Sequence, residues 1–147
     1  GAGTFKLHGI ADRIDRLNAG GAAIIDYKTG TPPSGDQVKV LLSPQLPLEG
    51  AILTAGGFAN VPAMAPSEFA YIQISGAADP GKVKAVKADA VELSTAALDR
   101  LKVRVALFDL ADTGYESRVA PVHIDTEGDY DHLARVREWS MSGWSGE

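Results

Sequence analysis

A turn between two apolar runs near the start of the chain most constrains the fold. Residues 18–21 read Asn-Ala-Gly-Gly, and an Asn with paired Gly between apolar runs is typical of a hairpin. We therefore expect strands over about 10–17 and 22–28 to be antiparallel neighbours. Folding the chain back about this turn places Asp12 roughly opposite Asp26 and Lys28, where cross-strand Cβ atoms lie about 4.5–5.5 Å apart.

The second of these strands ends in an Asp-x-Lys step. Because successive side chains of a strand point to opposite faces, Asp26 and Lys28 share one face. The carboxylate is suited to a divalent cation, and the ammonium can steady a nucleophilic water or the charge that develops on a phosphate. A surface ion pair is the alternative for an isolated Asp-x-Lys. A solvated charged face is the alternative for Asp12, although Ile10 and Ile14 share its face and suggest burial.

The predicted pairing brings two carboxylates together, which favours a hard cation. Two acidic groups at cross-strand range repel each other unless a cation lies between them or one is protonated. Mg²⁺ prefers oxygen ligands and commonly binds through one or two carboxylates and a substrate phosphate. We therefore expect Mg²⁺ at Asp12 and Asp26, with Mn²⁺ as an alternative ion.

Three motifs together carry a family resemblance. They are G-I-A-D-R-I-D at 9–15, I-I-D-Y-K-T-G at 24–30 and Q-L-P-L-E-G at 45–50. In this order they resemble the RecB-like branch of the PD-(D/E)xK nuclease superfamily. With the tail at 128–140, the chain resembles more narrowly the C-terminal nuclease domains of AddB proteins, which are subunits of bacterial AddAB helicase–nucleases.

The resemblance implies a role for each matching residue. Asp12 and Asp26 match the two metal-ligating acids, and the backbone carbonyl of Tyr27 matches a further metal ligand. Lys28 matches the lysine that activates or orients the attacking water. Gln45 matches the glutamine of a Q-x-x-x-Y motif, which supports the site or contacts DNA.

The chain departs from the family pattern in three ways. Glu49 stands where the motif has Tyr, and an acid there could bind metal or repel phosphate. Family members carry an acidic residue on a helix well before the first motif. We expect this chain to be an N-terminally truncated fragment without that helix and weakly active or inactive alone. It has no cysteine, so its own residues hold no iron–sulfur cluster of the kind found in many AddB proteins.

The implied function is Mg²⁺-dependent hydrolysis of phosphodiester bonds in DNA during double-strand break end processing for recombinational repair. The implied partners are DNA, chiefly single-stranded ends, and an AddA-like helicase–nuclease subunit. The alternative is a catalytically inactive DNA-holding or subunit-docking module on the same fold.

The net charge of −5 disfavours a stand-alone nucleic-acid binder. The lack of cysteine fits the cytoplasm, and no apolar run predicts a membrane span.

The pattern along the chain is α/β, and the resemblance implies a restriction-endonuclease-like core of a mixed β-sheet flanked by helices. We expect one domain over 1–147, with a tail from about 113 that is irregular and runs back over the domain. Ser43 and Ser94 are the expected helix caps, and the Lys-rich strand is an expected sheet edge. The expected strands cover about 4–9, 10–17, 22–28, 68–75 and 82–88, and the helices about 43–58 and 94–110. An apolar stripe at helical spacing predicts core positions at Leu98, Leu101, Val105 and Phe108.

Overall fold

The computed structural model describes residues 4–76 and 81–114. The chain divides into two compact units, Gly1–Asp109 and Leu110–Glu147, and the fold given below is that of the first. The predicted tail, including its motif at 128–140, lies outside the described residues beyond Gly114. Its expected course therefore stays a prediction.

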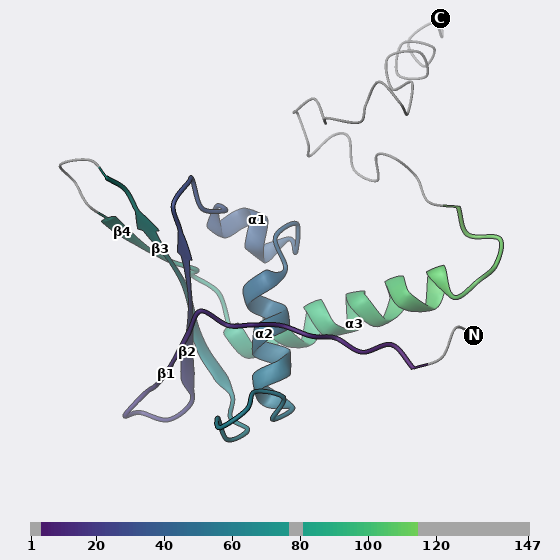
Figure 1. Cartoon of the computed structure of the whole chain (residues 1–147), viewed down its shortest axis with the longest axis horizontal. Coiled ribbons are helices and arrows are strands. Elements are labelled where there is room, and N and C mark those ends of the chain that lie inside the picture. Colours follow the sequence, from purple (N-terminus) through teal and green to yellow (C-terminus); the bar gives the residue numbers. More distant parts are fainter. Residues whose placement is uncertain (1–3, 77–80, 115–147) are drawn as a thin grey trace, which may run out of the picture. The chain divides into compact units, whose positions relative to one another are not determined.

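A mixed four-stranded sheet with the order β1-β2-β3-β4 forms the fold (Figure 1). The strands are β1 (Arg13–Arg16), β2 (Ala22–Lys28), β3 (Pro66–Ile74) and β4 (Gly81–Ala85), and the helices are α1 (Gly35–Lys39), α2 (Gln45–Thr54) and α3 (Ala90–Phe108). The two outer pairs of strands are antiparallel, whereas β2 and β3 are parallel. This arrangement confirms the predicted α/β class and is consistent with a restriction-endonuclease-like core.

The predicted hairpin joins β1 to β2. Gly20 and Gly21 have φ angles of 97° and 73°, which glycine adopts without the steric cost that a Cβ would bring. The strands are antiparallel, with Arg13 opposite Ile25. Continuing this register by one residue places Asp12 opposite Asp26, one of the two residues that the prediction set roughly opposite it.

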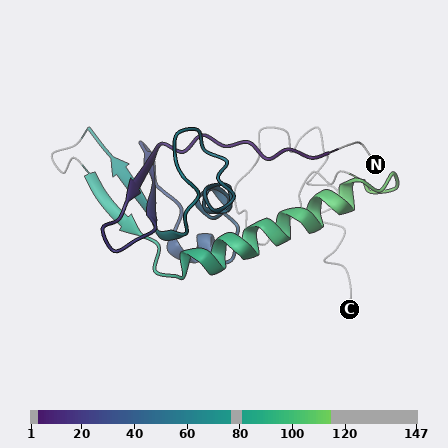
Figure 2. The ribbon, with the colours of Figure 1, turned by 90° about the horizontal axis from the view of Figure 1, so that it is seen from below.

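The expected strand over 4–9 is wrong, and the one over 10–17 is shorter than expected. Residues 4–12 have no regular strand, and β1 begins only at Arg13. The segment lies outside the sheet and crosses α2, which lies between it and α3 (Figure 2). A Cβ placed on Gly9 would lie 3.1 Å from Ile52 Cδ1 of that helix. The apolar residues of this segment therefore reflect packing on a helix and exposed positions rather than pairing in the sheet.

The core lies between the sheet and the helices α2 and α3. Ile24, Phe69 and Tyr71 point from β2 and β3 into it, and Leu46 and Leu53 meet them from α2. All five side chains are at most 2 % exposed. Each apolar side chain buried in this way stabilises the fold by about 1.5–3 kcal/mol relative to exposure. The burial of these side chains from both strands and from α2 holds the sheet against this helix.

Both long helices begin at other residues than predicted. Pro44 rather than Ser43 precedes α2, and no side chain caps that end. Asp89 caps α3 by accepting a hydrogen bond from Glu92 N at 2.8 Å. Ser94 lies inside α3, where its buried hydroxyl donates to the carbonyl of Ala90 at 2.6 Å. Asp is as good a cap as Ser, so the earlier cap extends the helix toward the chain start.

A short helix and one apolar stripe also differ from the sequence-based prediction. The sequence reasoning missed α1, which Ser34 and Gln37 hold by reciprocal side-chain-to-backbone hydrogen bonds of 3.2 and 2.8 Å. The stripe of Leu98, Leu101, Val105 and Phe108 is half-buried rather than core. The Lys-rich strand β4 is fully exposed and forms a sheet edge, as expected.

No helix in 4–76 or 81–114 combines the length and the apolar character that crossing a bilayer requires.

Candidate active site

Polar side chains gather where the end of β2 meets the first turns of α2. Asp26 and Lys28 come from β2, and Gln45 and Glu49 come from α2. Asp26 is 3 % exposed and Glu49 4 %, so both acids are withdrawn from bulk water. Acids are almost never buried to this degree unless they are paired.

Lys28 is the cation that faces Asp26. Its Nζ lies 2.8 Å from Asp26 Oδ2 and donates to Gln45 Oε1 at 3.2 Å. The Asp26 carboxylate is the main reason why the pKa of Lys28 is raised above its usual value. The side chain of Lys28 remains about one-third exposed. The ammonium is therefore charged at neutral pH and open to a ligand from solvent.

Gln45 holds the two buried acids together. Its Nε2 donates to Asp26 Oδ1 at 2.6 Å and to Glu49 Oε1 at 3.1 Å. It reaches Glu49 because residues four apart lie on one face of a helix, as the sequence predicted. One amide thus links the strand acid, the helix acid and Lys28.

Glu49 is the least satisfied of these groups. No described residue gives its Oε2 a hydrogen bond, although that atom is buried. Burial raises the pKa of Glu49, the charges of Asp26 and Asp12 raise it further, and Gln45 and Lys28 oppose the rise. In the sequence, Glu49 can be recognised as a site candidate because it is an acid one turn after Gln45 in a largely apolar helix.

Asp12 lies at the border of this cluster. Its Oδ2 accepts a hydrogen bond from Tyr27 N at 3.0 Å, which places the carboxylate beside the backbone between Asp26 and Lys28. The expected burial of Asp12 is wrong, because Asp12 is exposed and Ile10 is 90 % exposed. The strand β1 begins only at Arg13, so the alternation of side chains along a strand does not apply to Ile10.

Tyr27 itself points away from the cluster. Because it alternates with Asp26 and Lys28 along β2, its ring lies on the opposite face of the sheet. Its hydroxyl accepts a hydrogen bond from Arg13 Nη1 at 3.2 Å. Only the backbone of Tyr27 is therefore available to the site, which is the part that the family resemblance assigns to metal binding.

Tyr71 is a neighbour that the sequence reasoning missed. It lies opposite Asp26 on β3 and is 1 % exposed. Its hydroxyl makes no hydrogen bond of standard geometry to a described residue. Burial raises the pKa of Tyr71, and the hydroxyl of Ser43 offsets part of that rise. Tyr71 thus places a neutral hydroxyl beneath the buried acid.

The chemistry of the donor set fits a hard divalent cation. Asp12, Asp26 and Glu49 offer carboxylate oxygens, the ligands that Mg²⁺ prefers. The Oε2 atom of Glu49 has no hydrogen-bond partner among the described residues and is available as a metal ligand. In the described part of the chain, no group of three His, Cys, Asp or Glu side chains is placed so that it could hold a metal ion by itself. Lys28 supplies the positive charge that faces Asp26.

One family model and several curated relatives match the chain. The sequence model of a family described as the PD-(D/E)XK nuclease superfamily matches residues 1–122. Uncharacterised proteins of Rickettsia conorii and Rickettsia felis are 44 % and 45 % identical to the chain over 54 residues. Each match covers 37 % of the chain and 6 % of the relative, so the matched region spans a small part of these curated relatives. No solved structure matches the chain significantly.

Proposed function

Because the chain belongs to the PD-(D/E)XK nuclease superfamily, we propose that it hydrolyses phosphodiester bonds in DNA with Mg²⁺, with Mn²⁺ as an alternative ion. The observation that carries this proposal is the contact of 2.8 Å between Lys28 Nζ and Asp26 Oδ2 at the end of β2. It joins a buried carboxylate to an ammonium that is open to solvent. A phosphate at this place would meet both a metal ligand and a fixed positive charge.

In the proposed site, Asp12, Asp26 and the carbonyl of Tyr27 hold the metal ion, and Glu49 adds a further carboxylate. A bound divalent cation would supply charge stabilisation and a water of lowered pKa. The unsatisfied oxygen of Glu49 supports its inclusion. The family motif has a tyrosine at this position, and Glu49 would instead offer a carboxylate oxygen, the kind of ligand that Mg²⁺ prefers.

The proposed role of Lys28 follows from its charge. Asp26 raises the pKa of Lys28, and we propose that Lys28 acts as an ammonium rather than as a general base. It would orient the attacking water by donating a hydrogen bond, or balance the charge that builds on the phosphate. Gln45 fixes the ammonium because its Oε1 accepts a hydrogen bond from Lys28 Nζ at 3.2 Å. Gln45 is thus a positioning residue.

The wider role that we propose is the trimming of DNA ends at double-strand breaks for recombinational repair, in the cytoplasm and beside an AddA-like helicase–nuclease subunit. The glutamine motif at 45–50 and the tail at 128–140 support it by their resemblance to AddB proteins. The net charge of −5 also fits a domain whose DNA is delivered by a partner, because such a chain has little non-specific affinity for phosphates.

A non-catalytic DNA-holding or docking module is the second candidate. One observation favours it: the Asp26 carboxylate already has a positive partner in Lys28. Such a module would keep the fold and the Gln45 contacts but would have no need for a divalent ion.

A cleavage assay on single-stranded DNA separates the two candidates. We expect slow cleavage that requires Mg²⁺ or Mn²⁺ and is abolished in Lys28→Ala and Asp26→Ala. The matched control is Lys39→Ala, which removes an exposed lysine of α1 that pairs with the exposed Asp36. Equal cleavage by Lys28→Ala and the wild type would contradict the proposal. DNA binding without cleavage in either ion would favour the docking module.

A further inference from the structure

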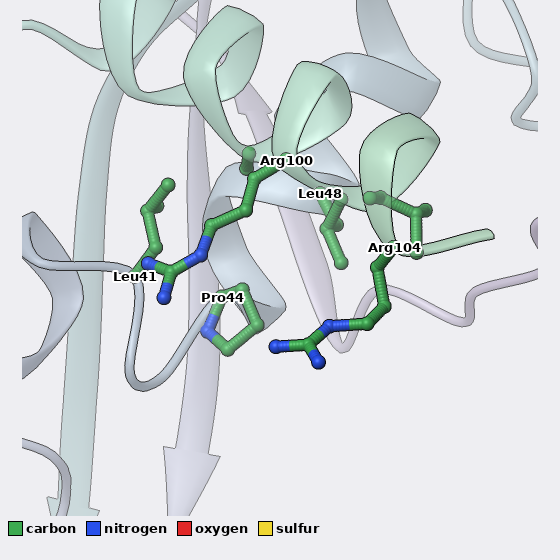
Figure 3. A pocket seen from close by; sticks show the side chains of 7 residues that line it. Leu41, Pro44, Leu48, Arg100 and Arg104 are labelled. Atoms are coloured by element: carbon green, nitrogen blue, oxygen red, sulfur yellow. The ribbon is translucent and has the colours of Figure 1, made fainter. Parts of the chain in front are cut away.

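A pocket of about 220 Å³ lies beside the candidate active site (Figure 3). The loop between α1 and α2, the start of α2 and the middle of α3 enclose it. Its apolar lining consists of Leu41, Pro44, Leu48, Ala97 and Leu101. Pockets that hold drug-sized ligands measure about 300–1,000 Å³. This one therefore has room for a single ring system.

Two arginines form the polar part of the pocket. Arg100 and Arg104 extend from successive turns of α3 along its rim (Figure 3). No acidic residue lines the pocket, and neither arginine has an ion pair with a described residue. Like charges four residues apart destabilise a helix. An anion bound between them would relieve that repulsion.

The loop at the pocket is held in a strained conformation. Leu41 has a φ of 57°, a left-handed value that is unfavourable for a residue with a Cβ. Arg100 Nη1 donates to the carbonyl of the preceding Val40 at 2.9 Å, so one pocket arginine also fixes this turn. Strained backbone that its surroundings enforce is concentrated at ligand-binding sites.

The pocket and the candidate active site share the first turns of α2. Pro44 and Leu48 face the pocket, whereas Gln45 and Glu49, each the next residue, face Asp26. The two sites therefore lie on adjacent faces of one helix, which is about 10–12 Å across with its side chains. A DNA strand with one phosphate at Lys28 would reach the pocket within about three nucleotides at a rise of ~3.4 Å each.

We propose that this pocket binds one nucleotide of a single-stranded DNA substrate, with the base on the apolar lining and its phosphate on Arg100 and Arg104. Guanidinium groups bind phosphate through two parallel hydrogen bonds. A base enters such a pocket only when it is unstacked and unpaired, as in a single strand. The inference rests on the proposed function and adds a reason for a preference for unpaired DNA.

Binding of a labelled oligothymidylate, measured by fluorescence anisotropy without divalent ions, tests the proposal. We expect Arg104→Gln to weaken binding about tenfold. The slope of log affinity against log salt should fall by about 0.7, because one phosphate no longer meets a cation. The matched control is Lys102→Gln, which removes the same charge from the same helix outside this pocket and leaves binding within about twofold. Equal thermal midpoints of the two variants show that neither result reflects unfolding.

The base is tested by changing the ligand. An oligomer with the same phosphates but abasic sugars should bind the wild type about fivefold more weakly, because it buries less apolar surface, and a paired duplex should likewise bind more weakly. Equal weakening in the two charge variants, or equal affinity for the abasic oligomer, would overturn the proposal. So would Arg104-dependent binding of an acidic, leucine-containing peptide in place of DNA, which would indicate a protein ligand.

The outcome is distinguishable from failure of the proposed nuclease activity. Arg104-dependent DNA binding without any metal-dependent cleavage would refute the nuclease and leave the pocket standing. Lys28-dependent cleavage together with DNA binding that is indifferent to Arg104 would refute the pocket alone.

Discussion

Replacing Glu49 by Gln is expected to stabilise the protein. The Glu49 carboxyl is 4 % exposed, and its Oε2 has no hydrogen bond from a described residue. Burial and the neighbouring charges of Asp26 and Asp12 make ionisation of this carboxyl unfavourable, and an unpaired buried group costs about 1–3 kcal/mol, more when it is charged. An amide of the same shape removes the charge. We expect a gain of about 1–2 kcal/mol at pH 7, or roughly 4–8 °C in the thermal midpoint.

The sign of the pH dependence follows from the raised pKa of Glu49. As pH rises from the usual value of 4.5 for this group, the unfolded chain loses its proton first and the native state becomes less stable. The advantage of Glu49→Gln is therefore absent below about that pH, since both states are then protonated. It grows through the window up to the raised pKa and is complete above it.

Thermal unfolding of the wild type and Glu49→Gln across this pH range is the assay. The matched control is Glu68→Gln, which neutralises an exposed acid on β3 and should leave the midpoint unchanged. A loss of stability at pH 7 comparable to the expected gain would refute the reasoning, because it would mean that the Glu49 carboxylate has partners that offset its burial.

Two further substitutions test the packing around the site. Gln45→Ala removes three hydrogen bonds, of 2.6, 3.1 and 3.2 Å, and should cost about 1–3 kcal/mol in urea denaturation; an unchanged midpoint would show that water replaces the amide. Gly50→Ala places a Cβ against Ser94 Oγ and 2.9 Å from Phe69 Cζ, and the overpacking should cost about 1–3 kcal/mol. Gly35→Ala in α1, where a Cβ meets nothing within 4 Å, is its control and should cost nothing.

The hairpin and the alignment at its end were predictable because they depend on local chemistry. A turn rich in Gly and the alternation along β2 were enough to place Asp12 roughly opposite Asp26 and Lys28. The spacing of four residues placed Gln45 beside Glu49. These relations hold within one hairpin or one helix, so no tertiary information was needed.

The remaining features depend on packing between distant segments. Residues 4–9 cross α2 instead of pairing in the sheet, and Gly9 lies close to Ile52 of that helix, a contact between distant segments that the sequence does not reveal. Asp89 and Ser94 are both good caps, and burial of Ser94 decided between them. Tyr71 lies beside Asp26 only because β2 and β3 pair in parallel, a register that no local pattern specified.

Titration of the protein with Mn²⁺, followed by electron paramagnetic resonance of the free ion, tests the central claim most directly. The account predicts one binding site that Asp26→Asn abolishes and Glu49→Gln weakens, whereas the Lys39→Ala protein binds like the wild type. If Asp26→Asn bound the ion as tightly as the unaltered chain, the carboxylates at the end of β2 would not hold a metal, and the proposed centre for cutting DNA would be contradicted.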